Sequence, residues 1–223
     1  MIGAVLFDVD GTLVDSNDLH ASAWQEAFRH FGLVVGYDAI RGQIGKGGDN
    51  LIPALLPADV VERLQEEIEE FRSDLFARDY LGKVRPFPGA ADLLRRLADE
   101  GVTLVLASSA KEAEVDHHIE RLGCRDLLTA VTSADDVEHS KPCPDIFAAA
   151  WEKSGAKAGA KNGERVTVVV GDTPYDIEAA SRIGLPAIAV RCGGFEDEDL
   201  ARAAAIFDDP THLHRAFPDW LPA

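Results

Sequence analysis

The sequence predicts an α/β fold, a doubly wound parallel sheet with an inserted all-helical cap domain. Two observations support this prediction. Six short, continuously apolar runs recur along the chain and alternate with helical stretches, and one stretch of about seventy residues near the N-terminus contains no such run. The length of 223 residues suits one α/β domain that carries a modest insertion.

The six apolar runs resemble strands that are buried on both faces of a parallel sheet, because they lack the alternation of a half-exposed strand. Helical patterns over 90–100, 113–122, 146–154 and 175–183 lie between them. Strands that alternate with helices form βαβ units with right-handed crossovers, which gives a Rossmann-like doubly wound sheet. The predicted strands span 2–7, 102–107, 128–132, 166–170, 186–190 and 204–207.

The segment 16–85 shows only helical patterns. The longest of them, over 57–81, spaces its apolar residues three or four positions apart, so that one face of the helix is buried. The crossings at 14–16 and 84–89 are the predicted hinges. The predicted domains are an α/β core domain over 1–15 and 86–223 and a helical cap domain over 16–85.

The chain is strongly acidic, and this charge excludes several functions. It has 22 Lys and Arg against 39 Asp and Glu, a net charge of −17. A field of this sign repels nucleic acids and anionic lipids, so neither is an expected partner. Three scattered cysteines form neither a disulfide framework nor a zinc motif, and no apolar run approaches the roughly 18 residues of a membrane helix. We expect a cytoplasmic protein.

Pairs of carboxylates follow two of the predicted strands. The first strand runs into Asp8-Val9-Asp10-Gly11-Thr12, where the spacing of two puts both carboxylates on one side of the chain. The strand over 166–170 leads to Asp172 and Asp176. Ligand sites in open α/β sheets lie at the carboxyl ends of the strands, so these acids should converge. A hard divalent cation, usually Mg²⁺, is the natural partner of such a group of carboxylates.

The remaining strand ends supply groups that bind anions. Ser108 follows the second strand and offers a hydroxyl that can donate to an oxyanion. Lys141 follows the third strand in a loop with flanking prolines. We expect both side chains to reach the same edge of the sheet as the four aspartates.

Together these motifs resemble the haloacid dehalogenase superfamily, and specifically its phosphatase-like members. The carrying residues are DVDGT at 8–12, Ser108, Lys141 in SKPCPDIF, and GDTPYD at 171–176. They occur in the right order over almost the whole chain, with the helical insertion between the first and second motifs. The resemblance implies a Mg²⁺-dependent phosphatase that hydrolyses a small phosphorylated metabolite of the sugar phosphate or phosphoglycolate class through an aspartyl-phosphate intermediate. We expect a monomer or a homodimer, between which the sequence does not decide.

The resemblance also implies roles for individual residues. Asp8 is the nucleophile, and Asp10 protonates the leaving alkoxide and later accepts a proton from water. Mg²⁺ is held by the carboxylates of Asp8 and Asp172 and the backbone carbonyl of Asp10, whereas Ser108 and Lys141 bind phosphoryl oxygens. Supporting positions are Val9, Ser109, Gly171 and Asp176. Asp176 supports the water shell of the metal or orients Lys141. The resemblance also implies a cis peptide bond before Pro142.

A second branch of the superfamily stays open. The stretch from Thr12 to His20, followed by Ala23-Trp24, also resembles β-phosphoglucomutase, in which a histidine at this place couples cap closure to the acid–base aspartate. Alternatively, His20 and Trp24 only pack one helix face. Gly171 stands where the mutase has a second metal-binding acid, which favours the phosphatase. A non-catalytic binder on the same fold is a further alternative, against which the complete set of acids and Lys141 argues.

Two other groups of residues carry weaker predictions. Arg41 and Lys46 belong to a glycine-rich loop over 41–49 and are candidates for contact with the non-reacting end of the substrate, although exposed cations in a plain turn would look the same. His117 and His118 are adjacent in a predicted helix and therefore point to different faces. We expect this pair at the surface.

Overall fold

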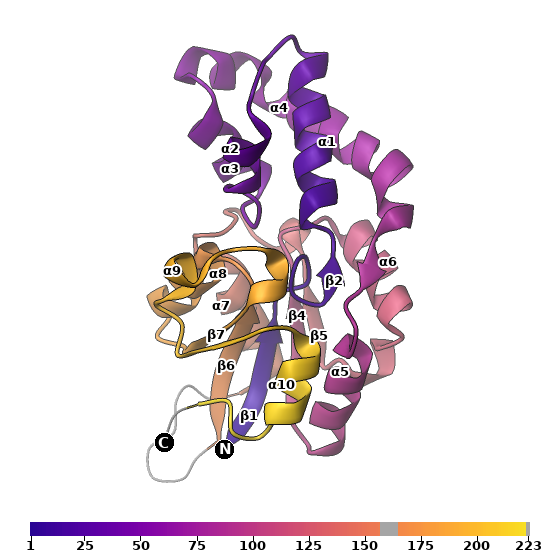
Figure 1. Cartoon of the computed structure of the whole chain (residues 1–223), viewed down its shortest axis with the longest axis vertical. Helices are drawn as coiled ribbons and strands as arrows, with labels where there is room; N and C mark the ends of the chain where they lie inside the picture. The colour runs from indigo at the N-terminus through magenta and orange to yellow at the C-terminus, as the bar shows by residue number, and fades with distance from the viewer. Residues whose placement is uncertain (157–164, 222–223) are drawn as a thin grey trace.

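The computed structural model describes residues 1–156 and 165–221 and centres on a six-stranded parallel sheet (Figure 1). The strand order is β5-β4-β1-β6-β7-β8, and every neighbouring pair is parallel. The predicted doubly wound sheet is confirmed, and each predicted apolar run contains a strand. The strands are β1 (Ile2–Phe7), β4 (Thr103–Ala107), β5 (Ala130–Thr132), β6 (Val166–Gly171), β7 (Ala187–Val190) and β8 (Ala205–Phe207).

Helices cover both faces of the sheet, which explains why its strands are apolar throughout. Within β1, Val5 and Phe7 pack into one hydrophobic cluster, and Leu6 packs into another on the opposite face. The first cluster is covered by α5 (Ala90–Asp99), α6 (Glu112–Leu122) and α10 (Pro210–Ala216). The second is covered by α7 (Asp145–Ser154), α8 (Pro174–Arg182) and α9 (Asp197–Leu200).

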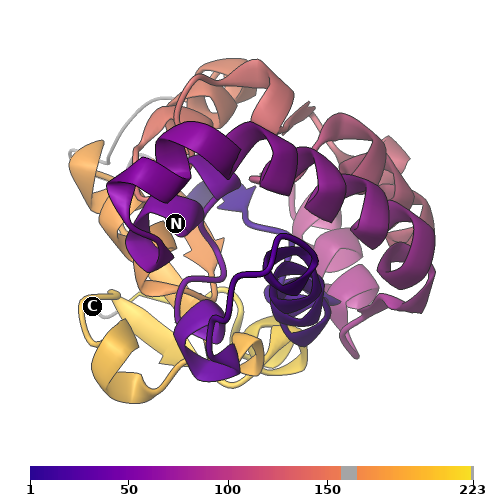
Figure 2. The same ribbon diagram turned by 90° about the horizontal axis from the view of Figure 1, so that it is seen from above.

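Residues 17–83, which we call the helical segment, lie between β1 and β4 and form four α-helices with a hydrophobic cluster of their own. Trp24, Phe28 and Ile68 are among the buried residues of this cluster. In Figures 1 and 2 the helical segment lies over the carboxyl ends of the strands. Its helices are α1 (Asn17–His30), α2 (Tyr37–Arg41), α3 (Gly48–Leu55) and α4 (Ala58–Leu75).

The longest predicted helix, over 57–81, differs in its last turns. The α-helix ends at Leu75 and continues as a wider π-helical turn, Phe76–Tyr80. This turn buries Phe76 completely, with its ring stacked on that of His20 at 4.1 Å between centroids. The widened turn therefore serves the packing against α1.

The chain leaves and re-enters the core side by side. Strand β2 (Val14–Asp15) pairs antiparallel with β3 (Arg85–Pro86), and Val14 lies opposite Pro86. The two crossings coincide with the predicted hinges, whereas their motion and the domain boundaries stay predictions. Among the described residues, no helix combines the length and apolar character that crossing a membrane requires.

Candidate active site

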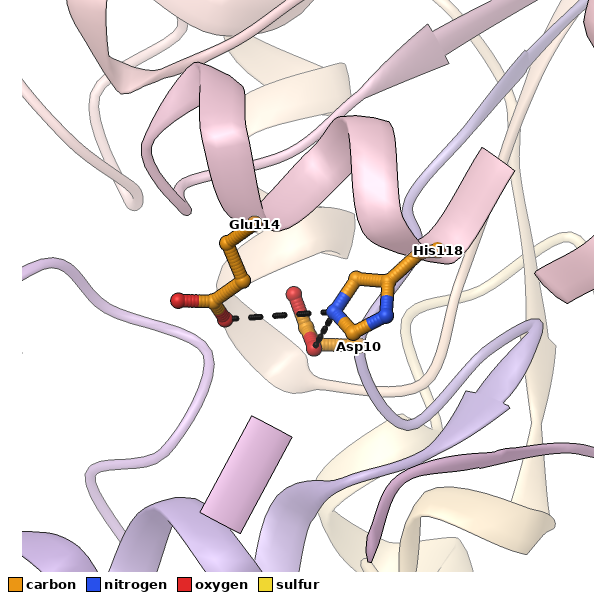
Figure 3. Close-up of side chains that lie close together, drawn as sticks. All are labelled: Asp10, Glu114 and His118. Atoms are coloured by element: carbon orange, nitrogen blue, oxygen red, sulfur yellow. Dashed lines mark ion pairs between the residues drawn. The ribbon is translucent and has the colours of Figure 1, made fainter. Parts of the chain in front are cut away.

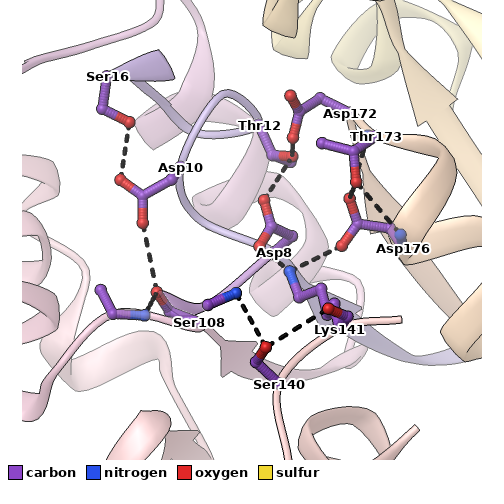
Figure 4. A network of polar contacts seen from close by, with 12 residues as sticks. Asp8, Asp10, Thr12, Ser16, Ser108, Ser140, Lys141, Asp172, Thr173 and Asp176 are labelled. Atoms are coloured by element: carbon purple, nitrogen blue, oxygen red, sulfur yellow. Dashed lines mark hydrogen bonds and ion pairs between the residues drawn. The ribbon is translucent and has the colours of Figure 1, made fainter. Parts of the chain in front are cut away.

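Three buried carboxylates meet where β1 and β6 end. Asp8 directly follows β1, Asp172 directly follows β6, and Asp176 lies in the first turn of α8. One carboxylate oxygen of each residue lies within 4.8 Å of one oxygen of the other two. The hydroxyl Oγ1 of Thr12 lies between two of them, 3.0 Å from Oδ2 of Asp8 and 3.1 Å from Oδ1 of Asp172 (Figure 4). The predicted convergence is confirmed for these three acids and is wrong for the side chain of Asp10, which belongs to a different group of residues.

Lys141 is the cation of this acidic cluster. Its side chain is almost completely buried, and its Nζ donates to Oδ1 of Asp8 and, at 2.7 Å, to Oδ1 of Asp176. The other oxygen of Asp176 accepts hydrogen bonds from the amide and hydroxyl of Thr173. Asp176 thus holds Lys141 against Asp8, and the Lys141–Pro142 peptide is cis, as the resemblance implies.

Burial and mutual repulsion dominate the electrostatics of this cluster. Burial raises the pKa of Asp8 well above its ordinary value, although Lys141 opposes the shift. Burial and the charge of Asp176 raise the pKa of Asp172 to about 7. For Lys141, burial acts to lower the pKa, but Asp176 and Asp8 outweigh it and hold the ammonium charged. One cation thus faces three carboxylates, so the site favours additional positive charge.

Glycines make the close approach of these side chains possible. A Cβ atom at Gly171 would lie 2.4 Å from Cγ of Asp176, and one at Gly193 would lie 1.8 Å from Oδ2 of Asp172. Both distances are far below van der Waals contact, so a larger residue would displace the acids. The predicted supporting role of Gly171 thus has a steric basis, and Gly193 adds a position that the sequence did not single out.

Asp10 points away from the acidic cluster into a different environment. Its Oδ1 accepts a hydrogen bond from Oγ of Ser16 at 2.7 Å and lies 3.0 Å from Nε2 of His20. Its Oδ2 accepts from Oγ of Ser108 at 3.3 Å. Burial alone would raise the pKa of Asp10. The interactions with His20 and His118 outweigh burial, so that the pKa of Asp10 lies well below its ordinary value.

His20 connects Asp10 to the helical segment. Nη2 of Arg72 contacts Nδ1 of His20, and the Arg72 guanidinium lies 5.2 Å from the Trp24 ring. Because arginine only donates, Nδ1 is the acceptor and the proton of a neutral imidazole lies on Nε2, which faces Asp10. His20 therefore presents an N–H to the carboxylate of Asp10.

A small cavity of about 90 Å³ lies between Asp8, Asp10 and the helical segment. It lies next to a larger groove of about 580 Å³. The cavity walls are mixed, with core residues on one side and residues of the helical segment on the other. Among the predicted site residues, Asp8, Asp10, Ser109, His20, Trp24 and Lys46 line it.

The structure separates the two loop cations that the sequence grouped together. Nε of Arg41 lies 2.8 Å from the carboxylate of Asp18, and its Nη2 contacts the carbonyl of Gly193, so the side chain is directed away from the cavity. Nζ of Lys46 donates to Oε1 of Gln43 at 2.5 Å beside the cavity.

The remaining predicted positions act through the backbone or behind the cavity wall. The carbonyl of Val9 accepts backbone hydrogen bonds from Thr12, Leu13 and Val14, which closes the turn after Asp8. Ser108 is fully buried and accepts from the amide of Ala110 at 3.0 Å. Its hydroxyl therefore contacts Asp10, whereas the neighbouring Ser109 faces the cavity.

The expectation of surface histidines is wrong for His118. This side chain is completely buried, and its Nε2 lies 3.5 Å from Oδ1 of Asp10 and 3.9 Å from Oε1 of Glu114. Burial would lower the pKa of His118, but the two carboxylates raise it to about 9. The missed signal is the spacing of four between Glu114 and His118, which puts both on one helix face.

Asn17 is a second missed residue. Its Nδ2 donates to Oδ2 of Asp172 at 2.7 Å and to the carbonyl of Gly193 at 2.9 Å. It begins α1, so the first residue of the helical segment is hydrogen-bonded to an acid of the core. Its place between the first motif and His20 was the only signal available in the sequence.

The sequence was also compared with models of known protein families. A family model described as haloacid dehalogenase-like hydrolase matches residues 5–190. The chain belongs to this family. The sequence motifs predicted this family. The match confirms both the family and the expectation that the protein is a hydrolase.

Phosphatases are among the curated relatives of this family member. "Probable phosphatase IndB" of Dickeya dadantii (strain 3937) is 31% identical over 203 residues, which cover 89% of this chain and 85% of that protein. The phosphoglycolate phosphatase of Rhodospirillum rubrum is 28% identical, with 98% of this chain and 90% of that protein covered. The Arabidopsis thaliana protein SUPPRESSOR OF QUENCHING 1, chloroplastic, is 30% identical over a match that covers 85% of this chain. That protein is much longer, and the match covers only 18% of it.

Solved structures share the fold. A hydrolase from Pseudomonas syringae has a TM-score of 0.88 at 26% identity and covers 99% of this chain and 100% of its own. CbbY from Rhodobacter sphaeroides, crystallised in complex with phosphate, has a TM-score of 0.71 at 26% identity, with 96% of each chain covered. The similarity in each case includes both the core and the helical segment.

Proposed function

We propose that this haloacid dehalogenase-like hydrolase is a Mg²⁺-dependent phosphatase that acts on a small phosphorylated metabolite through an aspartyl-phosphate on Asp8. The supporting observation is the arrangement of Asp8 and Asp10 on one cavity. Asp8 is held by Lys141 beside further carboxylates, and Asp10 is held by hydroxyl and imidazole groups. One aspartate is thus prepared for attack and the other for proton transfer.

The donor set fits Mg²⁺. Asp8 and Asp172 offer only oxygen atoms, as this ion prefers. Burial, and then the neighbouring carboxylates, raise the pKa of both groups, and a divalent cation would offset both effects. We assign these two carboxylates and the backbone carbonyl of Asp10 to the metal. Bound there, Mg²⁺ supplies the positive charge that lets a carboxylate approach a phosphate dianion. Asp176 is already engaged by Lys141 and Thr173, so we assign it to the positioning of Lys141.

In the first half-reaction a carboxylate oxygen of Asp8 attacks phosphorus in line with the leaving oxygen. Lys141, whose ammonium is oriented by Asp176, binds a phosphoryl oxygen. The Oγ of Ser109 lines the cavity, is buried, and has no hydrogen-bond partner among the described residues, so it is free to donate to the same group. Ser108 acts from behind the wall by fixing the carboxylate of Asp10.

Proton transfer uses Asp10 together with His20. In the free site the pKa of Asp10 is lowered, and its carboxylate faces the Nε2 proton of His20 at 3.0 Å. To act as the acid, Asp10 carries a proton when substrate is bound and transfers it to the leaving alkoxide, and the N–H of His20 then stabilises the carboxylate that forms. In the second half-reaction the carboxylate of Asp10 accepts a proton from the attacking water.

The helical segment forms one wall of the cavity and thereby contributes to substrate choice. Trp24 and Lys46 line the cavity on the side of the helical segment, where the non-reacting part of the substrate would contact the protein. We propose the sugar phosphate or phosphoglycolate class, and that the segment over 16–85 acts as a cap that opens about the paired crossings. A phosphoglycolate phosphatase among the relatives supports this class.

A β-phosphoglucomutase-type activity is the second candidate, because the predicted contact between His20 and Asp10 is present. Gly171 argues against it. A second metal-binding acid at this position would need the space that Asp176 occupies. Incubation with β-glucose 1-phosphate and a bisphosphate primer separates the two: we expect free phosphate, whereas glucose 6-phosphate without free phosphate would establish the mutase.

A panel of small phosphate esters tests the proposed phosphatase. We expect Mg²⁺-dependent release of phosphate from at least one ester and no release by Asp8→Asn. Asp15→Asn is the matched control, since Asp15 is exposed on the same segment. If no ester is hydrolysed, or if Asp8→Asn keeps the wild-type rate, the proposal fails.

A further inference from the structure

A second group of metal-ligand side chains lies on the other side of Asp10. It consists of Asp10, Glu114 and His118, whose ligand atoms lie within 4.8 Å of one another (Figure 3). Glu114 and His118 project from one face of α6, and Asp10 comes from the loop after β1. The group shares no side chain with the cluster of Asp8, Asp172 and Asp176.

Asp10 is hydrogen-bonded, but the other two members of this group have buried polar atoms without hydrogen bonds to the described part of the chain. His118 is completely buried, yet neither of its ring nitrogens has a hydrogen-bond partner among the residues that the structure describes. Within the same part of the chain, Oε1 of Glu114 is also buried without a hydrogen bond, and it lies at ion-pair distance, 3.4 Å, from Nε2 of His20. Buried polar atoms are normally satisfied, so these point to a ligand between them.

The distances suit a metal ion. Nε2 of His118 lies 3.5 Å from Oδ1 of Asp10 and 3.9 Å from Oε1 of Glu114. Metal–ligand bonds of about 2.0–2.2 Å separate neighbouring ligand atoms by roughly 3.0–3.5 Å. Small side-chain rotations therefore bring all three atoms to one ion. Asp10 and Glu114 also line the cavity, which gives the ion a path from solvent.

We propose that Asp10, Glu114 and His118 bind a first-row transition-metal ion of the Zn²⁺ type, at a site separate from that for Mg²⁺. An imidazole ligand favours Zn²⁺ over Mg²⁺, which prefers oxygen ligands and retains its water. Two carboxylates neutralise the charge of a divalent ion. Three protein ligands leave a coordination position for water.

Metal binding at this site changes what Asp10 can do. Without the ion, Oδ1 of Asp10 accepts a hydrogen bond from Oγ of Ser16 and faces the N–H of His20. An ion on the same oxygen displaces the His20 contact and occupies the carboxylate that transfers protons. The ion is therefore inhibitory, a consequence that, unlike the binding itself, rests on the proposed phosphatase function.

Zn²⁺ binding by the intact protein, measured calorimetrically with saturating Mg²⁺, tests the proposal. We expect wild-type protein to bind one more Zn²⁺ per chain than His118→Ala and Glu114→Gln. His117→Ala is the matched control, because it removes the adjacent imidazole of the same helix and should keep wild-type stoichiometry. Glu114→Gln preserves shape and keeps the test decisive if His118→Ala does not fold, which circular dichroism reports.

A visible spectrum of the Co²⁺-substituted protein provides a second readout, since the wild type but not Glu114→Gln should show the absorption of a bound ion at this site. If the wild type and both variants bind the same number of Zn²⁺ ions per chain, the proposal is wrong. The zinc would then be bound by the cysteine thiols or at the Mg²⁺ site. Because binding is measured without substrate, its result is independent of whether any phosphate ester is hydrolysed. Zn²⁺ binding without inhibition of an active enzyme would overturn only the inhibitory role.

Discussion

Asp8 and Asp10 are two residues apart and line one cavity, yet the structure gives them opposite electrostatic environments. Asp8 faces two buried carboxylates and one ammonium, and its pKa is raised. Asp10 faces two imidazoles and two hydroxyls, and its pKa is lowered. Burial acts in the same direction on both, so their neighbours account for the difference.

This difference separates the two tasks of the proposed reaction. In the proposed reaction, the acids around Asp8 favour a bound cation, and a metal ion there would make phosphate binding possible on a strongly acidic chain. The donors around Asp10 hold a carboxylate next to a proton. Loss of positive charge on the Asp8 side should therefore slow the reaction more than loss of a hydrogen-bond donor on the Asp10 side.

Removal of Mg²⁺ should have the largest effect on the Asp8 side. With a chelator we expect hydrolysis to fall at least about 10³-fold, because the metal supplies several kcal/mol of stabilisation to the transition state. Added Mg²⁺ should restore the rate, and phosphate esters should bind poorly without it, as titration calorimetry can measure. Tight ester binding in the chelated protein would show that the carboxylates do not need the ion.

Lys141→Met should come next, since Lys141 is the only cation among the described residues in contact with Asp8 and Asp176. We expect hydrolysis to fall about 10²–10³-fold, and the free energy of unfolding in urea to decrease by about 3 kcal/mol, because buried carboxylates lose their partner. Lys153→Met is the matched control, as Lys153 forms an exposed pair with Asp136. Wild-type rate and stability in Lys141→Met would contradict the arrangement.

His20→Ala tests the Asp10 side. We expect kcat to fall about 10²-fold, the usual contribution of a positioned proton-transfer group, whereas KM should change little. Steady-state kinetics on the best ester separate the two parameters. A rise in KM at constant kcat would assign His20 to substrate binding instead of proton transfer.

Gly171→Ala should have the smallest effect of the four. Its methyl group meets Asp176 at 2.4 Å and so disturbs the residue that orients Lys141. We expect a loss of about 1–3 kcal/mol in the free energy of unfolding and a modest decrease in kcat. Gly82→Ala provides the control, because a Cβ atom there meets no other atom within 4 Å. Equal free energies of unfolding for the two variants would show that Asp176 moves aside without a loss of stability.

Local pattern predicted much of this molecule. The strands were recognisable because helices bury both faces of the sheet, and Asp8, Lys141 and Asp172 were recognisable because they directly follow predicted strands or lie in a proline-flanked loop. Chain position alone places such residues at the carboxyl ends of parallel strands. The convergence of the acids on Lys141 therefore needed no knowledge of side-chain packing.

Contacts between helices were harder to predict. His118 looked like a surface residue because its partner Asp10 lies 108 positions earlier in the sequence, and only the packing of α6 against the loop after β1 buries it. Arg41 and Lys46 were equivalent in the sequence, yet one contacts Asp18 and the other lies beside the cavity. Such differences depend on how the helical segment lies on the core, which local pattern does not encode.

Rapid acid quenching followed by mass spectrometry gives the most direct test of Asp8 as the nucleophile. During turnover of a hydrolysed ester with Mg²⁺, we expect one phosphoryl group on the peptide that contains Asp8, removable by hydroxylamine as an acyl phosphate is. Asp8→Asn should show neither the adduct nor turnover. A phosphoryl group on another residue, or hydrolysis that persists in Asp8→Asn, would contradict the assignment of Asp8.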